Sequence, residues 1–161
     1  SNLFAFDTPE SMDAVFQTKI SAKTGRWKYI YVHHSNTAGG NALSLSREAG
    51  GLSDHFVIGN GDGAIDGEIQ IGQRWNQQES ANPPRGARGI DPNCISICLV
   101  GDLDHTVPTA TQLHRLTQLV NALQGRFDIP AGQVLLLNQG NSEAGMGRYF
   151  PATAFREQLL P

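Results

Sequence analysis

Two adjacent histidines, His33 and His34, follow a short apolar stretch and precede small, turn-forming residues. An imidazole can bind a metal ion, act as a general base or hydrogen-bond a backbone group. Because side chains alternate along an extended chain, the two rings point to opposite faces, and at most one of them faces a given cleft. Catalytic zinc needs three protein ligands, so the chemistry open to His33 depends on the residues beside it.

The cysteines and one aspartate are the nearest candidates for such partners. Cys94 and Cys98 lie in CISICLVG, which has the apolar, β-branched composition of a buried strand. At ~3.3 Å per residue they are about 13 Å apart, too far for a disulfide, so we predict two core thiols rather than a pair of metal ligands. Asp54 is a better partner, because a carboxylate beside His33 would hydrogen-bond the imidazole and hold the site together without metal.

The elements that position these residues alternate between strands and helices. HFVIGNGDG followed by GEIQIG predicts a hairpin, and apolar residues spaced by three and four after Pro108 predict an amphipathic helix on a sheet. The polar, Pro- and Gly-rich segment 73–93 predicts a long surface loop. We expect helices at 7–19, 41–49, from 107–109 to before 129, and at 155–160, with further strands at 27–33, in CISICLVG and at 134–137.

This order predicts an α/β fold in which helices flank a central mixed β-sheet. The chain has 161 residues, of which 39% are hydrophobic, which fits a single domain over 1–161 with its own core. We assign 1–26 to an N-terminal helical extension and 27–160 to the core of the domain. Ligands of such folds usually bind at strand ends, where His33 lies.

Composition excludes several classes of partner. The formal charge is −3, and the basic and acidic residues are mixed along the chain, so we expect neither nucleic acid nor a polybasic membrane contact. No apolar run approaches the ~18 residues of a membrane span, and SNLFAFDTPE lacks the pattern of a signal peptide. The sequence leaves the oligomeric state open.

Several motifs resemble those of one family. VHHS, HFVIGNGDG followed by GQRW, ICLVGDL leading into PTATQL, and RYFPATAFREQL occur in this order between about 27 and 159. Together they resemble the type 2 N-acetylmuramoyl-L-alanine amidases, a family that includes the peptidoglycan recognition proteins. The resemblance implies a mixed sheet flanked by helices, a groove for a glycan-linked peptide stem, and a place in the cell envelope, the periplasm or outside the cell.

The resemblance also implies a zinc site that this chain lacks in part. Active members hold zinc by the first histidine of the pair, a second histidine in a GHRDV-like segment and a cysteine or aspartate before the last helix. Here His33 is the only retained ligand position, because Asn138 and Gly145 stand at the other two. Asp54 stands at the family's tyrosine, and Arg88 stands where many members have a substrate-contacting histidine. We therefore expect that zinc, the family's cofactor, has been lost and that no metal is bound.

Three functions follow from the resemblance. The first is a domain that binds peptidoglycan or muramyl peptide without hydrolysing it. The second is a hydrolase with a rebuilt metal site, in which Asp62, Asp66 or Glu143 joins His33 and Asp54, or a metal-free hydrolase that uses this pair alone. The third is a structural or protein-interaction domain. The ligand-binding residues expected for the first are His33, His34, Asn36, Asp54, Trp75, Arg88 and Asn138.

Each of these residues also has a plainer interpretation. Trp75 fits a core position, Arg88 a solvated loop cation, and His34 a packed ring that hydrogen-bonds a backbone group. His55 alternates with Asp54 and should face away from the cleft, which makes it structural. The remaining histidines, His105 and His114, are expected to be exposed.

Overall fold

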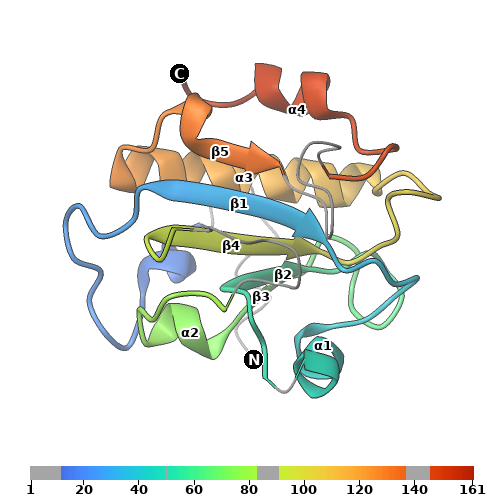
Figure 1. Ribbon diagram of the computed structural model, residues 1–161, viewed down its shortest axis with the longest axis horizontal. Coiled ribbons are helices and arrows are strands. Elements are labelled where there is room, and N and C mark those ends of the chain that lie inside the picture. The colour runs from blue at the N-terminus through green and yellow to red at the C-terminus, as the bar shows by residue number, and fades with distance from the viewer. Residues whose placement is uncertain (1–11, 50, 83–90, 137–145) are drawn as a thin grey trace.

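The structure is a computed structural model that describes residues 12–49, 51–82, 91–136 and 146–161 (Figure 1). Its strands and helices follow one another in the mixed order that the sequence predicts. The strands are β1 (Tyr29–His34), β2 (Phe56–Ile58), β3 (Ile69–Ile71), β4 (Cys94–Leu99) and β5 (Val134–Leu136). The helices are η2 (Asp13–Phe16), α1 (Ala42–Ala49), α2 (Gln73–Asn76), α3 (Ala110–Phe127), η3 (Ala131–Gln133) and α4 (Ala152–Glu157).

The strands form one mixed sheet in the order β3-β2-β4-β1-β5. β2 and β3 are the predicted antiparallel hairpin, and the other neighbouring strands run parallel. β1 and β4 pair along their whole length, with Tyr31 opposite Ser96 and His33 opposite Cys98. The central mixed sheet of the predicted α/β fold is thus confirmed.

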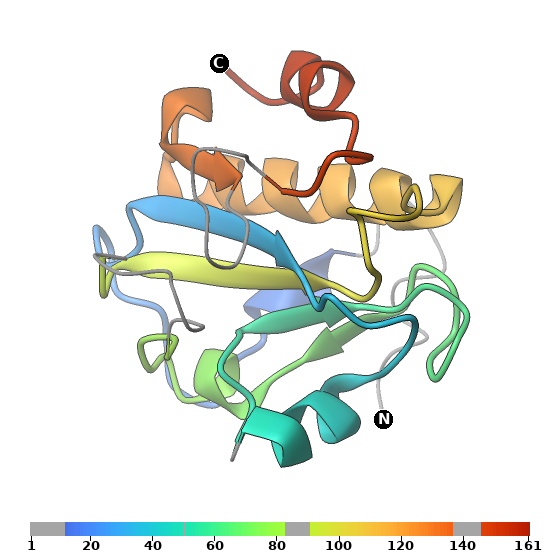
Figure 2. The ribbon, with the colours of Figure 1, turned by 45° about the vertical axis from the view of Figure 1, so that its right-hand side comes forward.

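The two faces of the sheet differ in chemistry. Figure 2 shows α3 and α4 along one side of the sheet and α1 on the other. The face toward α3 is apolar, with Ile30 and Val32 of β1 in the same core cluster as Leu116 and Val120 of α3. Because side chains alternate, the opposite face carries the polar and sulfur-containing side chains of β1 and β4: Tyr31, His33, Cys94, Ser96 and Cys98.

Helix α3 follows its predicted pattern closely. Thr109 caps its start, since the Thr109 hydroxyl accepts from the Gln112 backbone and the Gln112 side chain accepts from the Thr109 backbone. The helix ends at Phe127, where Asp128 adopts a left-handed conformation with φ 56°. None of the described helices is long and apolar enough to cross a membrane.

Two loops at the same end of the sheet pack closely on each other. The backbone N–H of Gly40, in the loop after β1, donates to the Asp62 carbonyl in the hairpin turn at 2.8 Å. A Cβ atom at Gly39 would lie only 2.4 Å from Asp62 Cγ, and one at Gly63 would lie 3.0 Å from the Gly40 nitrogen. The small residues that follow the histidine pair therefore allow the two loops to touch.

Three predicted elements differ from the structure. Of the helix predicted at 7–19, the described part is a single turn, η2, and the Thr18 hydroxyl bonds the Ile20 carbonyl at 2.5 Å, a local contact that competes with helix. The described part of the proposed helical extension at 1–26 has no other helix. The segment 73–93 is not all loop, because α2 forms around the buried Trp75. The last helix, α4, lies three residues earlier than predicted.

Candidate functional site

The predicted contact between His33 and Asp54 is confirmed. His33 is the fifth residue of β1, and Asp54 lies two residues before β2, so the pairing of both strands with β4 brings the two side chains together. His33 Nε2 lies 2.6 Å from Asp54 Oδ1, and both residues are buried, with 3% and 5% of their surface exposed. His33 Nδ1 lies 3.1 Å from the His34 carbonyl oxygen, which can only accept, so Nδ1 carries a hydrogen.

Ser96 holds Asp54 in place. Its hydroxyl donates to the same Oδ1 atom of Asp54 at 2.5 Å. Its backbone N–H donates to His55 Nδ1 at 3.0 Å, and its carbonyl accepts from the His55 N–H at 2.9 Å. Three hydrogen bonds therefore tie the Asp54-His55 dipeptide to one residue of β4. Sequence reasoning missed Ser96, although its alternation with Cys94 and Cys98 placed it on their face.

His55 is structural, as predicted. Its Nδ1 accepts from Ser96, so the hydrogen is on Nε2, which donates to the Glu79 carbonyl at 2.7 Å. The ring centroid lies 4.9 Å from that of Trp27 and 5.6 Å from that of Trp75. This ring is neutral and has no free nitrogen for a ligand.

Cys98 is a third donor that the sequence analysis assigned to the core alone. It is buried, but it faces the same side of the sheet as His33, its partner across β1 and β4. The donor atoms of His33, Asp54 and Cys98 all lie within 4.8 Å of one another. In the described part of the chain, this is the one place where three such side chains meet. The expected loss of zinc is therefore not supported, because His33 and Asp54 meet a third possible metal ligand, Cys98.

Burial and charge set the protonation of this cluster. Burial alone lowers the pKa of His33, but the charge and hydrogen bond of Asp54 more than reverse this, so the pKa is raised. Burial alone raises the pKa of Asp54. The charge of His33, together with the hydrogen bonds that Asp54 accepts from His33 and from the Ser96 hydroxyl, brings this pKa below its usual value. Burial and then Asp54 raise the pKa of Cys98 well above its usual value. These shifts favour the charged forms of His33 and Asp54 beside a neutral Cys98 thiol.

Other predicted residues fall outside this cluster. His34 is a packed ring, as predicted, because its Nδ1 accepts from the Leu103 N–H at 3.0 Å. Asn36 is exposed in the loop after β1, with φ 62°. Trp75 is fully buried and its Nε1 donates to the Val15 carbonyl at 2.7 Å, so the core interpretation holds and it is not a groove wall.

Two of the three carboxylates proposed as extra metal ligands, Asp62 and Asp66, do not join the cluster. Asp62 and Asp66 are exposed in the hairpin turn, and Asp66 instead accepts from the Thr109 hydroxyl at 2.5 Å, which ties the turn to α3. His105 and His114 are exposed, as predicted. Four candidates lie outside the described residues: Arg88, Asn138, Glu143 and Gly145.

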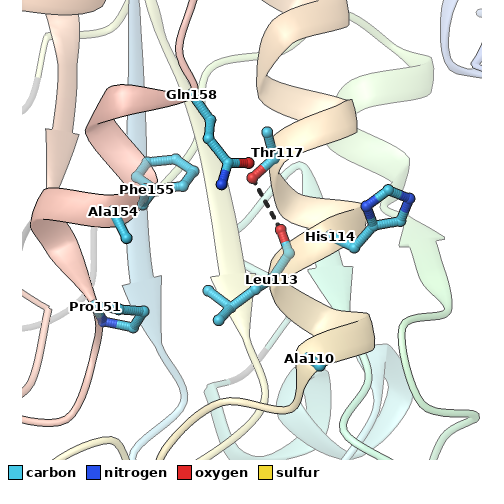
Figure 3. A pocket seen from close by; sticks show the side chains of 8 residues that line it. All are labelled: Ala110, Leu113, His114, Thr117, Pro151, Ala154, Phe155 and Gln158. Atoms are coloured by element: carbon cyan, nitrogen blue, oxygen red, sulfur yellow. Dashed lines mark hydrogen bonds between the residues drawn. The ribbon is translucent and has the colours of Figure 1, made fainter.

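A separate hollow of about 260 Å³ lies between α3 and α4, on the other side of the sheet from His33 (Figure 3). The Thr117 hydroxyl donates to the Leu113 carbonyl on its wall at 3.0 Å. Four residues of α3, two of α4 and the two residues that flank α4 line it: Ala110, Leu113, His114, Thr117, Ala154, Phe155, Pro151 and Gln158. It has no contact with the cluster around Asp54.

Comparison with known sequences decides the family. The profile of the N-acetylmuramoyl-L-alanine amidases matches residues 23–143, three quarters of the chain, which include His33, Asp54, Ser96 and Cys98. The chain belongs to this amidase family. Among curated proteins, none matches it.

Solved structures of the amidase family share the fold. The endolysin amidase LysCS of Clostridium intestinale superposes with a TM-score of 0.64 at 17% identity, over 88% of this chain and 93% of that one. The recognition protein PGRP-Hd of Alvinella pompejana superposes with a TM-score of 0.54 at 16% identity, over 89% of this chain and 90% of that one. Human PGRP-Iβ C, solved with a glycosamyl muramyl pentapeptide, superposes with a TM-score of 0.55 at 16% identity, over 87% of this chain and 90% of that one. At these identities the likeness shows a shared fold.

Proposed function

We propose that this amidase-family domain binds muramyl peptides of peptidoglycan and does not cleave them. The observation that carries the proposal is the closure of the site around His33. A hydrolytic zinc needs three protein ligands and an open position for water and the substrate carbonyl. The three donors here, His33, Asp54 and Cys98, are 3%, 5% and 1% exposed, so the cluster offers no such position.

The ligand is proposed from the fold and from two polar residues of the sequence. One protein of the same fold was solved with a glycosamyl muramyl pentapeptide. A peptide stem presents amides and carboxylates, which an exposed amide such as Asn36 and a cation such as Arg88 can bind. A peptidoglycan ligand would place the domain in the cell envelope, the periplasm or outside the cell.

The test separates binding from cleavage. Titration calorimetry with a muramyl pentapeptide should show saturable binding, and chromatography of the same mixture should show intact peptide, with or without added zinc. Arg88→Ala should weaken binding by about tenfold or more, because it removes a charge-assisted hydrogen bond. Arg85→Ala, three residues away with the same charge change, is the matched control and should bind as the wild type does.

Either of two results would overturn this proposal. Absence of binding to any muramyl peptide would leave the protein-interaction domain as the remaining function. Release of the peptide from the lactyl group would support the second candidate, a hydrolase with a rebuilt metal site, for which His33, Asp54 and Cys98 are the candidate ligands. A zinc-dependent cleavage that is lost in Cys98→Ser would then identify the metal ligand.

A further inference from the structure

Three side chains with different donor atoms meet on the polar face of the sheet. His33 comes from β1, Cys98 from β4, and Asp54 from the segment before β2. They offer one nitrogen, one sulfur and one oxygen within 4.8 Å of one another, and all three are buried. Imidazole, thiolate and carboxylate are the three protein donors that Zn²⁺ uses.

Hydrogen bonds already orient two of these donors. Metal-binding histidines nearly always donate their second ring N–H to a carbonyl or a carboxylate, which fixes the ring. His33 Nδ1 makes this contact with the His34 carbonyl at 3.1 Å and leaves Nε2 directed at Asp54. Metal-binding carboxylates are hydrogen-bonded in turn, and Asp54 accepts from the Ser96 hydroxyl.

Tyr31 supplies an independent observation at the same place. Its ring stands edge-on to His33, with centroids 5.0 Å apart, and the residue is buried. Its hydroxyl has no hydrogen-bond partner among the described residues. A buried hydroxyl is normally paired, so the Tyr31 hydroxyl beside this cluster is open to a partner outside the described residues.

We propose that His33, Asp54 and Cys98 form a closed binding site for one divalent metal ion of the Zn²⁺ type. The site differs from the zinc site of the family, with which it shares only His33, because its other two donors come from Asp54 and β4. Its closure makes the metal structural, in agreement with a domain that binds peptide without cleaving it.

The three donor atoms would adjust their spacing to admit the ion. In a tetrahedral zinc site, neighbouring nitrogen and oxygen donors stand about 3.3 Å apart and nitrogen and sulfur donors about 3.6 Å apart. The metal would take the place of the proton between His33 Nε2 and Asp54 Oδ1, now 2.6 Å apart. The Cys98 thiol becomes a thiolate when it binds the ion. The thiol proton and the Nε2 proton of His33 both pass to solvent.

Cys94 provides a matched control for Cys98. Both thiols lie on the same face of β4, both are 1% exposed, and each sulfur lies 3.8 Å from the carbonyl of the next residue. Only Cys98 belongs to the cluster of three donors. Cys94→Ser and Cys98→Ser therefore make the same chemical change in the same strand, and the first should leave metal binding intact.

The experiment uses Co²⁺ alone as a probe on the metal-free protein. The wild type and Cys94→Ser should bind one ion per chain and show the near-ultraviolet absorption of a cobalt thiolate, which zinc abolishes by displacement. Cys98→Ser should lose that absorption and bind at least about 100-fold more weakly, because losing a ligand costs more than losing a residue that orients one. A wild type without thiolate absorption would overturn the proposal, as would absorption that survives in Cys98→Ser.

Asp54→Asn gives a second variant in case Cys98→Ser does not fold. It keeps the shape of the side chain and should retain the thiolate absorption with weaker binding of the ion. Unchanged affinity in this variant would remove Asp54 from the site. None of these measurements involves a muramyl peptide, so the failure of the metal site and the failure of peptide binding are separate results.

Discussion

Acid should destabilise the fold through His55 in a way that one substitution can isolate. The ring packs edge-on against two tryptophans, accepts from the Ser96 N–H and donates to the Glu79 carbonyl, so the fold requires its neutral form. Burial, the largest influence, lowers the pKa of His55 from 6.5 to about 4. The same ring in the unfolded chain takes up a proton below about pH 6.5.

The difference in the pKa of His55 between the folded and unfolded chain sets the sign and size of its effect on the free energy of unfolding. Because the unfolded state binds the proton first, His55 lowers the free energy of unfolding as the pH falls from 6.5 toward 4. With the pKa of about 4, the loss relative to pH 7.5 is about 2 kcal/mol at pH 5 and about 3 kcal/mol at pH 4. His33 acts in the opposite direction, since its pKa is raised, so the wild type alone does not isolate the effect.

The assay compares the wild type with His55→Gln by urea unfolding with a chelator, followed by tryptophan fluorescence. The wild type should be more stable at pH 7.5, and its advantage over His55→Gln should shrink by about 2 kcal/mol at pH 5. A difference that stays constant between these pH values would refute the buried neutral ring. Glutamine cannot titrate, so the pH dependence of the gap belongs to His55.

Three other substitutions test the site and the loops around it. Asp54→Ala breaks a buried pair and leaves His33 without its carboxylate partner. It should lower the free energy of unfolding by about 3–5 kcal/mol, or the thermal midpoint by about 6–20 °C. The exposed Asp62→Ala should change the free energy of unfolding by less than about 0.5 kcal/mol in the same melts. Ser96→Ala removes one hydrogen bond to Asp54 and should lower the free energy of unfolding by about 1.5–3 kcal/mol. A decrease as large as that of Asp54→Ala would contradict the view that His33 is the stronger partner of Asp54. Gly39→Ala should cost about 1–3 kcal/mol by overpacking against Asp62, whereas Gly132→Ala, whose Cβ meets nothing within 4 Å, should be neutral by urea titration.

The sequence predicts the contact between His33 and Asp54, but it does not predict Cys98 or Ser96 as partners. The hairpin, α3 and the strand at 94–99 follow from local patterns of alternation and helical spacing. Which side chains of β1 and β4 meet depends on a parallel pairing between strands some sixty residues apart. Alternation sorts Tyr31, His33 and Cys98 onto faces, but only the register places Cys98 beside His33.

The same limit explains Trp75 and the loop that was predicted around it. Polar neighbours, glycine and proline dominate the segment 73–93, so local composition favours a loop. The turn of α2 forms because Trp75 packs against Trp27 and Phe56, residues far away along the chain. Tertiary burial here outweighs a weak local preference.

The contrast between His33 and His55 shows how neighbours, rather than residue type, determine what each ring can do. Both are buried, and both have hydrogen bonds at each ring nitrogen. His55 faces one donor and one acceptor, so it stays neutral and holds Ser96. His33 faces two acceptors, so its Nε2 proton lies where a metal ion can replace it, with Cys98 as the additional ligand. An ion there would be enclosed by the donors that bind it, which is why the site favours holding a metal over hydrolysing a peptide.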